Sequence, residues 1–383
     1  MNRMKKLILL LLISVQLFAQ KTVFKANPKE VLEQPHETLK IGSKAPDFTL
    51  PATDGKFYSL KNFTSSKVLV IIFTCTHCPT AQAYEDRMIK FTNDYKSEGV
   101  QVIAISPNSP TGLMYEELGY TDLGEDFEDM KVRYKDKGFN FPFLYDGDNE
   151  AVSIKYGPIA TPHAYIFDQN RILKYSGRLD GIEKPGKADS EDLRMATDVV
   201  LAGNDPNPAT TKVFGCSTKW GWKNEYKAKV QAEWDAKPIS IEELDDNGIK
   251  DLLKNDSKKL RLINVWATWC GPCVVEYPEF VSIQRMYGQR DFEFVSISAD
   301  RITQKERALN LLKSKHSAVK NYIFNGKDSY QLIEAIDPKW DGALPYTLLI
   351  EPGGKIVYSI QGGIKPLVLK KKIVEHPMIG RYF

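Results

Sequence analysis

The stretch Asn264–Pro278, which reads NVWATWCGPCVVEYP, decides the fold of this chain. It overlaps an apolar, β-branched run at Leu260–Trp266 that predicts a buried strand, and it leads into a helical pattern over Pro272–Met286. Two cysteines, Cys270 and Cys273, therefore lie where a strand ends and a helix begins. The free amides and the positive dipole end of a helix N-terminus stabilise a thiolate and lower its pKa. We predict that Cys270 is the attacking thiol and that Cys273, one turn further on, resolves the mixed disulfide.

A second Cys-x-x-Cys pair, Cys75 and Cys78, occurs earlier in the chain within the same order of signals. Val68–Phe73 predicts a buried strand, Pro79–Ser97 a helix, and Val100–Ser106 the next strand. In the later segment the corresponding second strand is predicted at 292–298. Strands that alternate with helices indicate an α/β fold with a partly parallel sheet, and the repeated order indicates two such units.

In both segments an x-Pro pair follows and leads into a further strand. Thr161-Pro162 precedes the predicted strand Ala164–Phe167, and Leu344-Pro345 precedes Tyr346–Ile350. Pro352-Gly353-Gly354 then predicts a turn into a last strand at 355–360. The two units are therefore expected to share their architecture.

Length and composition are those of a folded two-domain protein. The chain has 383 residues, 42% hydrophobic and 26% charged residues, and a net charge of +3. A weak net charge without a basic run argues against nucleic acid as a partner. We divide the chain into a signal peptide at 1–20, a first domain at 37–222, a linker helix at 223–238 and a second domain at 239–383.

The N-terminus has the pattern of a secretory signal. Arg3, Lys5 and Lys6 precede an apolar run at 7–17. This run is too short to cross a bilayer, because a transmembrane helix needs roughly 20 apolar residues. We expect cleavage near Ala19, a periplasmic or otherwise secreted mature protein, and no stable membrane insertion.

The five cysteines indicate redox chemistry more than structural bracing. Each Cys-x-x-Cys pair closes a loop too small to restrict the unfolded chain much. A zinc ion held jointly by both pairs is the competing reading, but the pairs lie far apart, each at its own strand-to-helix junction. No cofactor and no metal site are predicted.

The segment Asn264–Pro278 resembles the active-site segment of the TlpA/ResA-like thiol-disulfide oxidoreductases of the thioredoxin superfamily, over residues 238–375. The resemblance implies a thioredoxin-like fold. It also implies that Glu276 tunes the thiols, that Pro278 kinks the helix, and that Pro345 follows a cis peptide bond beside the dithiol.

The first segment resembles the redoxin branch that includes the AhpC/TSA peroxiredoxins, over residues 40–222. The motifs that carry this resemblance are Lys44–Phe48, the stretch FTCTHCPTAQAYEDR at Phe73–Arg87, ATPHAYIFD at Ala160–Asp168, and Gly215–Ser217. Together the two resemblances imply two tandem thioredoxin-like folds, each a central mixed sheet flanked by helices, with Pro162 as the first domain's cis-proline.

The first domain departs from the peroxiredoxin pattern. Typical members carry a Pro and a Thr seven and three residues before the reactive cysteine, and counted from Cys78 these positions hold Ile71 and Cys75. Losing the Thr hydroxyl removes a hydrogen bond to peroxide, while a second thiol supplies a resolving partner. Dithiol-disulfide exchange therefore fits this sequence better than efficient peroxide reduction.

Three further residues remain open to two interpretations each. His77 either stabilises a thiolate at Cys75 as an imidazolium, which would make this pair the stronger oxidant, or points to solvent. Cys216 either reacts with Cys75 or Cys78 or packs as a structural thiol against Trp220. His163 either touches substrate or has a local backbone partner.

The sequence thus predicts an extracytoplasmic thiol-disulfide oxidoreductase that exchanges disulfides with proteins through two centres, with the Pro162 and Pro345 loops presenting backbone to an extended partner. Trp266 and Trp269 flank the second centre, one in the core and one at the rim. Apocytochrome c and a membrane thiol reductant are candidate partners. The alternatives are a thiol peroxidase with the second domain as internal reductant, and a thiol-based binding module in cytochrome c or metal-site assembly.

Overall fold

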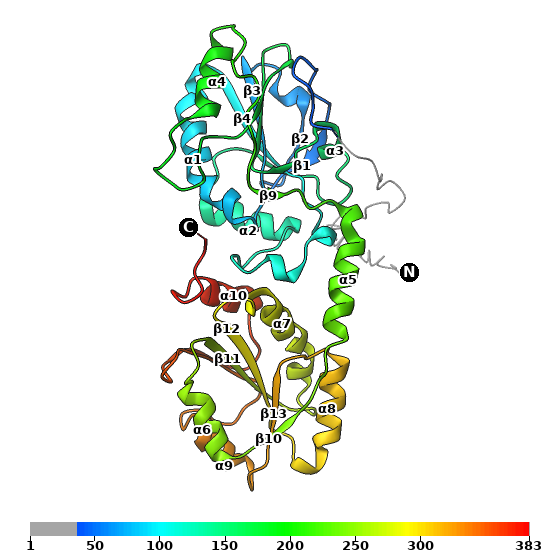
Figure 1. Cartoon of the computed structure of the whole chain (residues 1–383), viewed down its shortest axis with the longest axis vertical. Coiled ribbons are helices and arrows are strands. Elements are labelled where there is room, and N and C mark those ends of the chain that lie inside the picture. Colours follow the sequence, from blue (N-terminus) through cyan, green and yellow to red (C-terminus); the bar gives the residue numbers. More distant parts are fainter. Residues whose placement is uncertain (1–36, 383) are drawn as a thin grey trace, which may run out of the picture.

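The computed structural model describes residues 37–382, and the predicted signal peptide lies outside the described residues. Two α/β domains follow one another along the long axis of the molecule and are joined by the helix α5 (Figure 1). Within the described part of the chain, no helix combines the length and the apolar character needed to cross a membrane.

The first domain is built around a five-stranded mixed sheet in the order β5-β4-β3-β7-β8. β3 pairs in parallel with β4 and antiparallel with β7. The strands span β3 Val68–Phe73, β4 Val100–Ser106, β5 Phe143–Tyr145, β7 His163–Phe167 and β8 Leu173–Gly177.

The central strand β3 reads VLVIIF and is buried throughout because both faces of the sheet are covered. Its side chains alternate between the two faces, as the two-residue period of a strand requires. Val70 and Ile72 enter one hydrophobic cluster, while Leu69 and Ile71 enter the other. This strand therefore fixes where the following Cys-x-x-Cys loop begins.

The remaining elements of the first domain surround this sheet. Its helices are α1 Pro79–Tyr95, α2 Phe127–Lys137, α3 Ser153–Tyr156 and α4 Asp192–Leu201. Two small sheets pair β1 Thr49–Pro51 with β2 Phe57–Ser59, and β6 Ala160–Thr161 with β9 Cys216–Ser217.

The second domain repeats this topology with one additional strand, in the order β10-β13-β12-β11-β14-β15. Its strands are β10 Glu242–Leu244, β11 Leu260–Trp266, β12 Phe292–Ser298, β13 Lys320–Phe324, β14 Tyr346–Ile350 and β15 Ile356–Gln361. Its helices are α6 Asp246–Lys254, α7 Gly271–Tyr287, α8 Lys305–Ser314, α9 Ser329–Ile336 and α10 Pro366–Val374. β11 is parallel to β12 and antiparallel to β14, as β3 is to β4 and β7.

The predicted mixed sheets flanked by helices are thus confirmed. The strands 68–73, 100–106, 260–266, 292–298 and 346–350 have the predicted bounds. The helix expected over 79–97 ends at Tyr95, because the chain tightens into a 3₁₀ turn at Lys96–Glu98. The helix expected from Pro272 begins one residue earlier, at Gly271.

The linker helix α5 (Asn224–Asp235) ends against the second domain, where Trp234 Nε1 donates to the carbonyl oxygen of His316 over 2.9 Å. A loop of the first domain also contacts α7. Glu116 accepts a hydrogen bond from Arg285 Nε at 2.8 Å, and the carbonyl oxygen of Thr121 accepts one from the Tyr287 hydroxyl at 2.7 Å. The domains therefore meet at the C-terminal end of α7.

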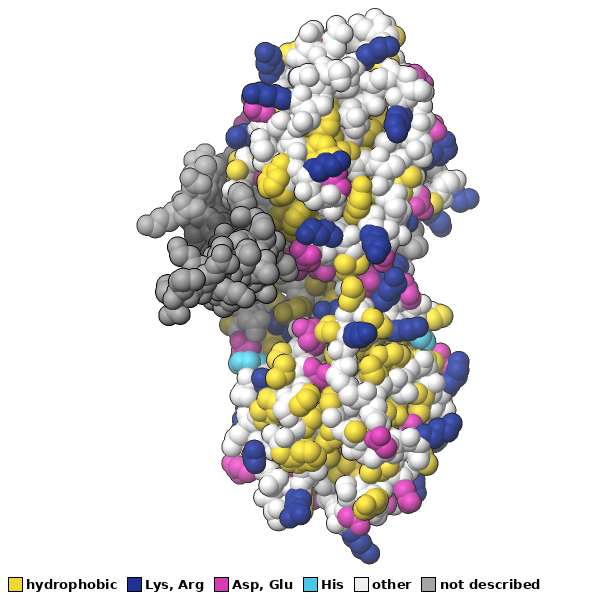
Figure 2. Space-filling model, turned by 180° about the vertical axis from the view of Figure 1, so that it is seen from behind, with side chains coloured by type: hydrophobic (Ala, Val, Ile, Leu, Met, Phe, Trp, Pro, Cys, Tyr) yellow, Lys and Arg dark blue, Asp and Glu magenta, His cyan; other side chains and the backbone are white. Residues whose placement is uncertain are grey.

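The face of the molecule drawn in Figure 2 carries Lys and Arg side chains interspersed with Asp and Glu. No single-sign patch dominates this face.

Candidate functional site

The second centre lies at the N-terminus of α7, which begins at Gly271 with Cys270 as its N-cap. Cys270 and Cys273 form a disulfide, and the Cys273 amide donates to Cys270 Sγ over 3.3 Å. Cys270 is the more accessible of the two, with 6% of its surface exposed against 1% for Cys273. This order of exposure is the one that the sequence predicts. An amide hydrogen bond and a helix N-terminus both stabilise negative charge on Cys270 when the disulfide opens.

The surroundings of the second centre are apolar and partly open. Trp266 is fully buried in the core, whereas 63% of Trp269 is exposed. This division of the two tryptophans is the predicted one. Val275, in the second turn of α7, is 80% exposed. Large apolar side chains this exposed beside a dithiol form a surface on which a protein segment can dock.

A cis-proline lies next to each centre. The peptide bonds before Pro162 and Pro345 are both cis, as expected, and a third cis bond before Pro208 was not expected. Val265 of β11 pairs with Tyr346, so Pro345 adjoins the end of the strand that leads to Cys270. Phe73 pairs with His163, which brings Pro162 to the corresponding place beside Cys75.

Glu276 lies one helical turn after Cys273 and is partly buried. Its Oε2 accepts a hydrogen bond from the Ile364 amide at 2.8 Å, and its buried Oε1 has no hydrogen-bond partner. Burial raises the pKa of this carboxyl, although the Ile364 hydrogen bond opposes the shift. A carboxyl of raised pKa can take up and release protons closer to neutral pH than an exposed one.

The first centre differs from the second in its position and its exposure. Cys78, the second cysteine of the pair, is the N-cap of α1. Cys75 is 3% exposed, Cys78 0% and His77 2%. We expected both pairs to be open to a visiting thiol, and for the first pair this expectation is wrong. The Cys-x-His-Cys loop is covered by the loop before α2 and by β9, contacts that no local pattern in the sequence reveals.

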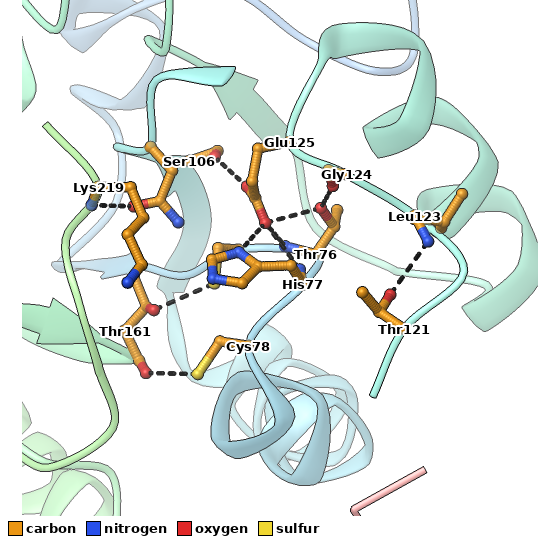
Figure 3. Close-up of polar contacts among 12 residues, drawn as sticks. Thr76, His77, Cys78, Ser106, Thr121, Leu123, Gly124, Glu125, Thr161 and Lys219 are labelled. Atoms are coloured by element: carbon orange, nitrogen blue, oxygen red, sulfur yellow. Dashed lines mark hydrogen bonds and ion pairs between the residues drawn. The ribbon is translucent and has the colours of Figure 1, made fainter. Parts of the chain in front are cut away.

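His77 is held by a buried carboxylate, as Figure 3 shows. Its Nδ1 lies 2.7 Å from Glu125 Oε1, so the interpretation that His77 points to solvent is wrong. The same Glu125 oxygen accepts hydrogen bonds from the amides of Thr76 and His77, both at 2.7 Å. Its other oxygen accepts from Ser106 Oγ at 3.1 Å. Glu125 thus fixes both the backbone of the Cys-x-His-Cys loop and the orientation of the imidazole.

This arrangement separates the pKa values of the two thiols. Although burial alone lowers the pKa of His77, the charge of Glu125 and its hydrogen bond raise it above the usual value. Burial tends to raise the pKa of Cys78, but hydrogen bonds from Cys216 and Cys75 and the charge of His77 hold it well below the usual value. Burial, with the hydrogen bond to Cys78 and the charge of Glu125, raises the pKa of Cys75. We expected the His77 imidazolium to stabilise a thiolate at Cys75, but its charge stabilises the thiolate of Cys78 instead.

Thr161 contacts both thiols of the first centre. Its Oγ1 lies 3.1 Å from Cys75 Sγ, and its carbonyl oxygen lies 3.5 Å from Cys78 Sγ. The neighbouring His163 is buried, and its Nε2 lies 3.0 Å from Ser176 Oγ. The partner of His163 is therefore a side-chain hydroxyl of β8, not the local backbone group that we expected.

Three residues of the first centre could hold a metal ion. Cys75, His77 and Glu125 each offer one ligand atom, and these atoms lie within 4.8 Å of one another. Thiolate, imidazole and carboxylate together suit a divalent transition metal. Glu125 already accepts hydrogen bonds from the His77 ring and from the His77 amide of the loop, so a cation would have to displace these bonds. This donor set differs from the two-pair zinc site considered from the sequence.

Two residues of the first centre, Glu125 and Thr161, were not predicted from the sequence. Glu125 follows His77 by 48 positions and belongs to no motif with it. Thr161 precedes a recognised cis-proline, which is the one signal that could have drawn attention to it. Both act through contacts that only the folded chain creates.

Two thioredoxin-like sheets, each with a dithiol at a strand-to-helix junction and a cis-proline beside it, define the class of thioredoxin-type thiol oxidoreductases. Residues 41–176 match the AhpC/TSA family model and residues 235–375 match the Redoxin model, so each domain is similar to a redoxin-type family.

Among relatives, thiol-disulfide oxidoreductase ResA of Oceanobacillus iheyensis is 24% identical over 144 residues, 36% of this chain and 60% of that protein. The chain therefore spans less than two thirds of that relative's length. Alkyl hydroperoxide reductase E of Mycobacterium bovis is 24% identical over 172 residues, 43% of this chain and 97% of that protein. Among solved structures, the hypothetical protein SMc02350 from Sinorhizobium meliloti is 31% identical in sequence and has a TM-score of 0.43. The match covers 48% of this chain and 97% of that protein's chain.

Proposed function

We propose that this chain is an extracytoplasmic thiol-disulfide oxidoreductase with two dithiol centres, in which Cys270 exchanges disulfides with protein partners. The observation that carries the proposal is the Cys270–Cys273 disulfide at the N-terminus of α7, with the more exposed cysteine of the pair at the N-cap. The exposed Trp269 and the adjoining cis-Pro345 loop support a protein segment as the partner.

The exchange follows from this geometry. A partner thiolate attacks Cys270 Sγ, the bond to Cys273 breaks, and Cys273 leaves as a thiolate that takes up a proton. A second partner thiol then attacks the partner sulfur of the mixed disulfide and releases Cys270 as a thiolate. The partner loses two electrons and the Cys270–Cys273 pair gains them, and the reverse sequence reduces a partner disulfide. Glu276, whose pKa burial raises, is the proposed proton acceptor and donor for these steps.

The proposed location rests on the sequence. The basic residues and the short apolar run before residue 20 support export, and the Cys270–Cys273 disulfide fits an oxidising compartment. Apocytochrome c remains one candidate among the protein partners.

A test of this function compares turnover by single-cysteine variants of the full chain. We expect Cys270→Ser to lower the reduction of a model protein disulfide by about 1,000-fold or more, because no other thiol replaces the attacking sulfur. Cys75→Ser is the matched control and should change turnover by less than about threefold, because Cys75 is buried in the other domain. Equal losses in both variants would refute the assignment of exchange to the second centre.

The burial of the first centre favours a second candidate function, reduction of a small peroxide at Cys78. A protein segment cannot reach a sulfur that is 0% exposed, whereas a two-oxygen oxidant needs far less space. The thiolate favoured at Cys78 is the nucleophile that such a reaction requires. In the step, Cys78 attacks one peroxide oxygen and becomes a sulfenic acid, and the other oxygen leaves as water or alcohol. Cys75 then forms the disulfide and releases a second water.

This candidate predicts that Cys78→Ser abolishes thiol-dependent peroxide consumption, while Cys273→Ser leaves the first turnover unchanged. Stopped-flow measurement of peroxide loss separates that first turnover from recycling. Recycling by the second domain is disfavoured in this arrangement: Arg285, which contacts the first domain, lies fifteen residues after Cys270, about 22 Å along α7. A Cys78→Ser variant that consumes peroxide at the wild-type rate would exclude the candidate.

A further inference from the structure

Cys216 lies beside the first centre because of how two short strands pair. β9 runs antiparallel to β6, with Cys216 directly opposite Thr161. Gly215 makes this approach possible, since its φ is +135° and a Cβ there would lie 2.1 Å from the Thr161 carbonyl oxygen. The close approach of the two backbones therefore requires glycine at position 215, directly before Cys216.

Thr161 is the common neighbour of three cysteines. Its side chain contacts Cys75 Sγ at 3.1 Å, its carbonyl contacts Cys78 Sγ at 3.5 Å, and its strand partner is Cys216. Cys75, Cys78 and Ala81 form one small buried cluster, and Cys216 packs against it. Cys216 is the half-buried member of this group, whereas the other two sulfurs are enclosed.

Cys216 and Cys78 share a side-chain hydrogen bond, so their sulfurs lie within reach of each other. The hydrogen bond to Cys78, with burial, raises the pKa of Cys216, while the same hydrogen bond helps to lower the pKa of Cys78. A lowered pKa makes Cys78 a good leaving group when a thiol attacks Cys216 in a Cys78–Cys216 disulfide, because a thiol of lower pKa leaves faster in disulfide exchange.

We propose that Cys216 is a third redox-active thiol, which takes over Cys78 from the Cys75–Cys78 disulfide and connects the buried centre with thiols in solution. Cys216 attacks Cys78 Sγ, the Cys75–Cys78 bond breaks, and the Cys78–Cys216 bond forms. The proton that Cys216 loses goes to the departing Cys75, so the protein is neither oxidised nor reduced in this step.

The next step transfers electrons from a thiol in solution, such as glutathione. Its thiolate attacks Cys216 Sγ, and Cys78 leaves as the stabilised thiolate. A second solution thiolate then attacks the solution-thiol sulfur of the mixed disulfide and releases Cys216. Two solution thiols become one disulfide, and the protein gains the two electrons that they lose. This proposal rests on the proposed thiol-disulfide function and assigns its first centre a route to solvent.

The first experiment maps disulfides in the full-length chain. Reduced wild type, Cys75→Ser and Cys216→Ser proteins are treated with one equivalent of diamide, alkylated in acid and analysed as non-reduced peptides by mass spectrometry. We expect wild type to contain both Cys75–Cys78 and Cys78–Cys216 bonds and Cys75→Ser to contain Cys78–Cys216. In the first domain, Cys216→Ser should form only the Cys75–Cys78 bond. A folded Cys75→Ser protein that lacks the Cys78–Cys216 bond would overturn the proposal.

The second experiment measures access to the oxidised centre. We expect Cys216→Ser to slow reduction of the Cys75–Cys78 disulfide by glutathione about tenfold or more, with reduction of Cys270–Cys273 unchanged as the internal control. In oxidised Cys75→Ser, the first glutathione adduct should be on Cys216. Equal reduction rates, or an adduct on Cys78, would overturn the proposal. Neither readout uses a protein partner, so failure of protein-disulfide turnover remains a separate result.

Discussion

Replacing Glu125 with glutamine is expected to raise the pKa of the Cys78 thiol and to leave about tenfold less Cys78 thiolate at pH values well below the wild-type pKa. Glu125 raises the pKa of His77 through its charge and hydrogen bond, and the His77 charge in turn lowers that of Cys78. Glutamine keeps an oxygen acceptor for the loop amides but removes the negative charge. A buried His77 without that charge becomes neutral, so Cys78 loses its cationic neighbour.

The measurement is a pH titration of cysteine Cβ signals by NMR in ¹³C-labelled full-length protein, which needs no reagent to enter the buried site. Glu128→Gln is the matched control, because this glutamate lies three residues further on, in the first turn of α2, and pairs with Lys131 at the surface. It should leave the Cys78 titration unchanged. An unchanged Cys78 titration in Glu125→Gln would disprove the role that we assign to this carboxylate.

The same pair gives a pH dependence of stability. The folded pKa of His77 is raised above its ordinary value of 6.5. The stabilisation from the charged pair is therefore complete below about pH 6.5 and is lost as the pH rises through the raised folded pKa. We expect this part of the pH dependence to be missing in Glu125→Gln when the free energy of unfolding is measured across that range.

Replacing Arg133 with alanine is expected to lower the free energy of unfolding by about 3 kcal/mol, because it leaves a buried carboxylate without its main partner. Arg133 of α2 binds Glu85 of α1 through two hydrogen bonds of 2.7 and 2.6 Å. Lys137, 3.7 Å from the same carboxylate, remains as a weaker partner, so we expect the lower end of the range for broken buried pairs. The pair joins the helix that follows the first centre to the helix that follows Glu125.

Urea unfolding of the full-length protein, followed by a signal from the first domain, measures this loss. Lys131→Ala is the matched control, since its ion pair with Glu128 is exposed and should contribute less than about 0.5 kcal/mol. A double variant, Glu85→Leu with Arg133→Leu, should recover part of the loss because no unpaired charge stays buried. If Arg133→Ala unfolds at the same urea concentration as Lys131→Ala, the pair does not hold the two helices together.

Local patterns predicted most of the fold correctly. The β-branched runs at Val68–Phe73 and Leu260–Trp266 are buried on both faces, and such strands are recognisable from a few adjacent residues. The Cys-x-x-Cys pairs and the cis-prolines are likewise short, contiguous signals. The second centre was therefore placed well, including the division between the buried Trp266 and the exposed Trp269.

The errors concern contacts between distant parts of the chain. Nothing near Cys75 reveals that the loop carrying Glu125 closes over the first centre, or that Cys216 joins it from far downstream. The sequence places His77 beside Cys75, and we expected its charge to stabilise a thiolate there. In the structure, hydrogen bonds from Cys216 and Cys75 and the charge of His77 favour a thiolate at Cys78 despite its burial. Tertiary contacts thus decide which sulfur of a pair is reactive.

The most direct measurement of the central claim is the trapping of a mixed disulfide on the full-length Cys273→Ser protein. A peptide that contains a disulfide is offered, the reaction is quenched in acid, and the bonded cysteine is identified by mass spectrometry. The account predicts that the peptide is bound to Cys270 and that Cys75 and Cys78 remain free of it. A peptide bound to Cys75 or Cys78, or no adduct at Cys270, would contradict it.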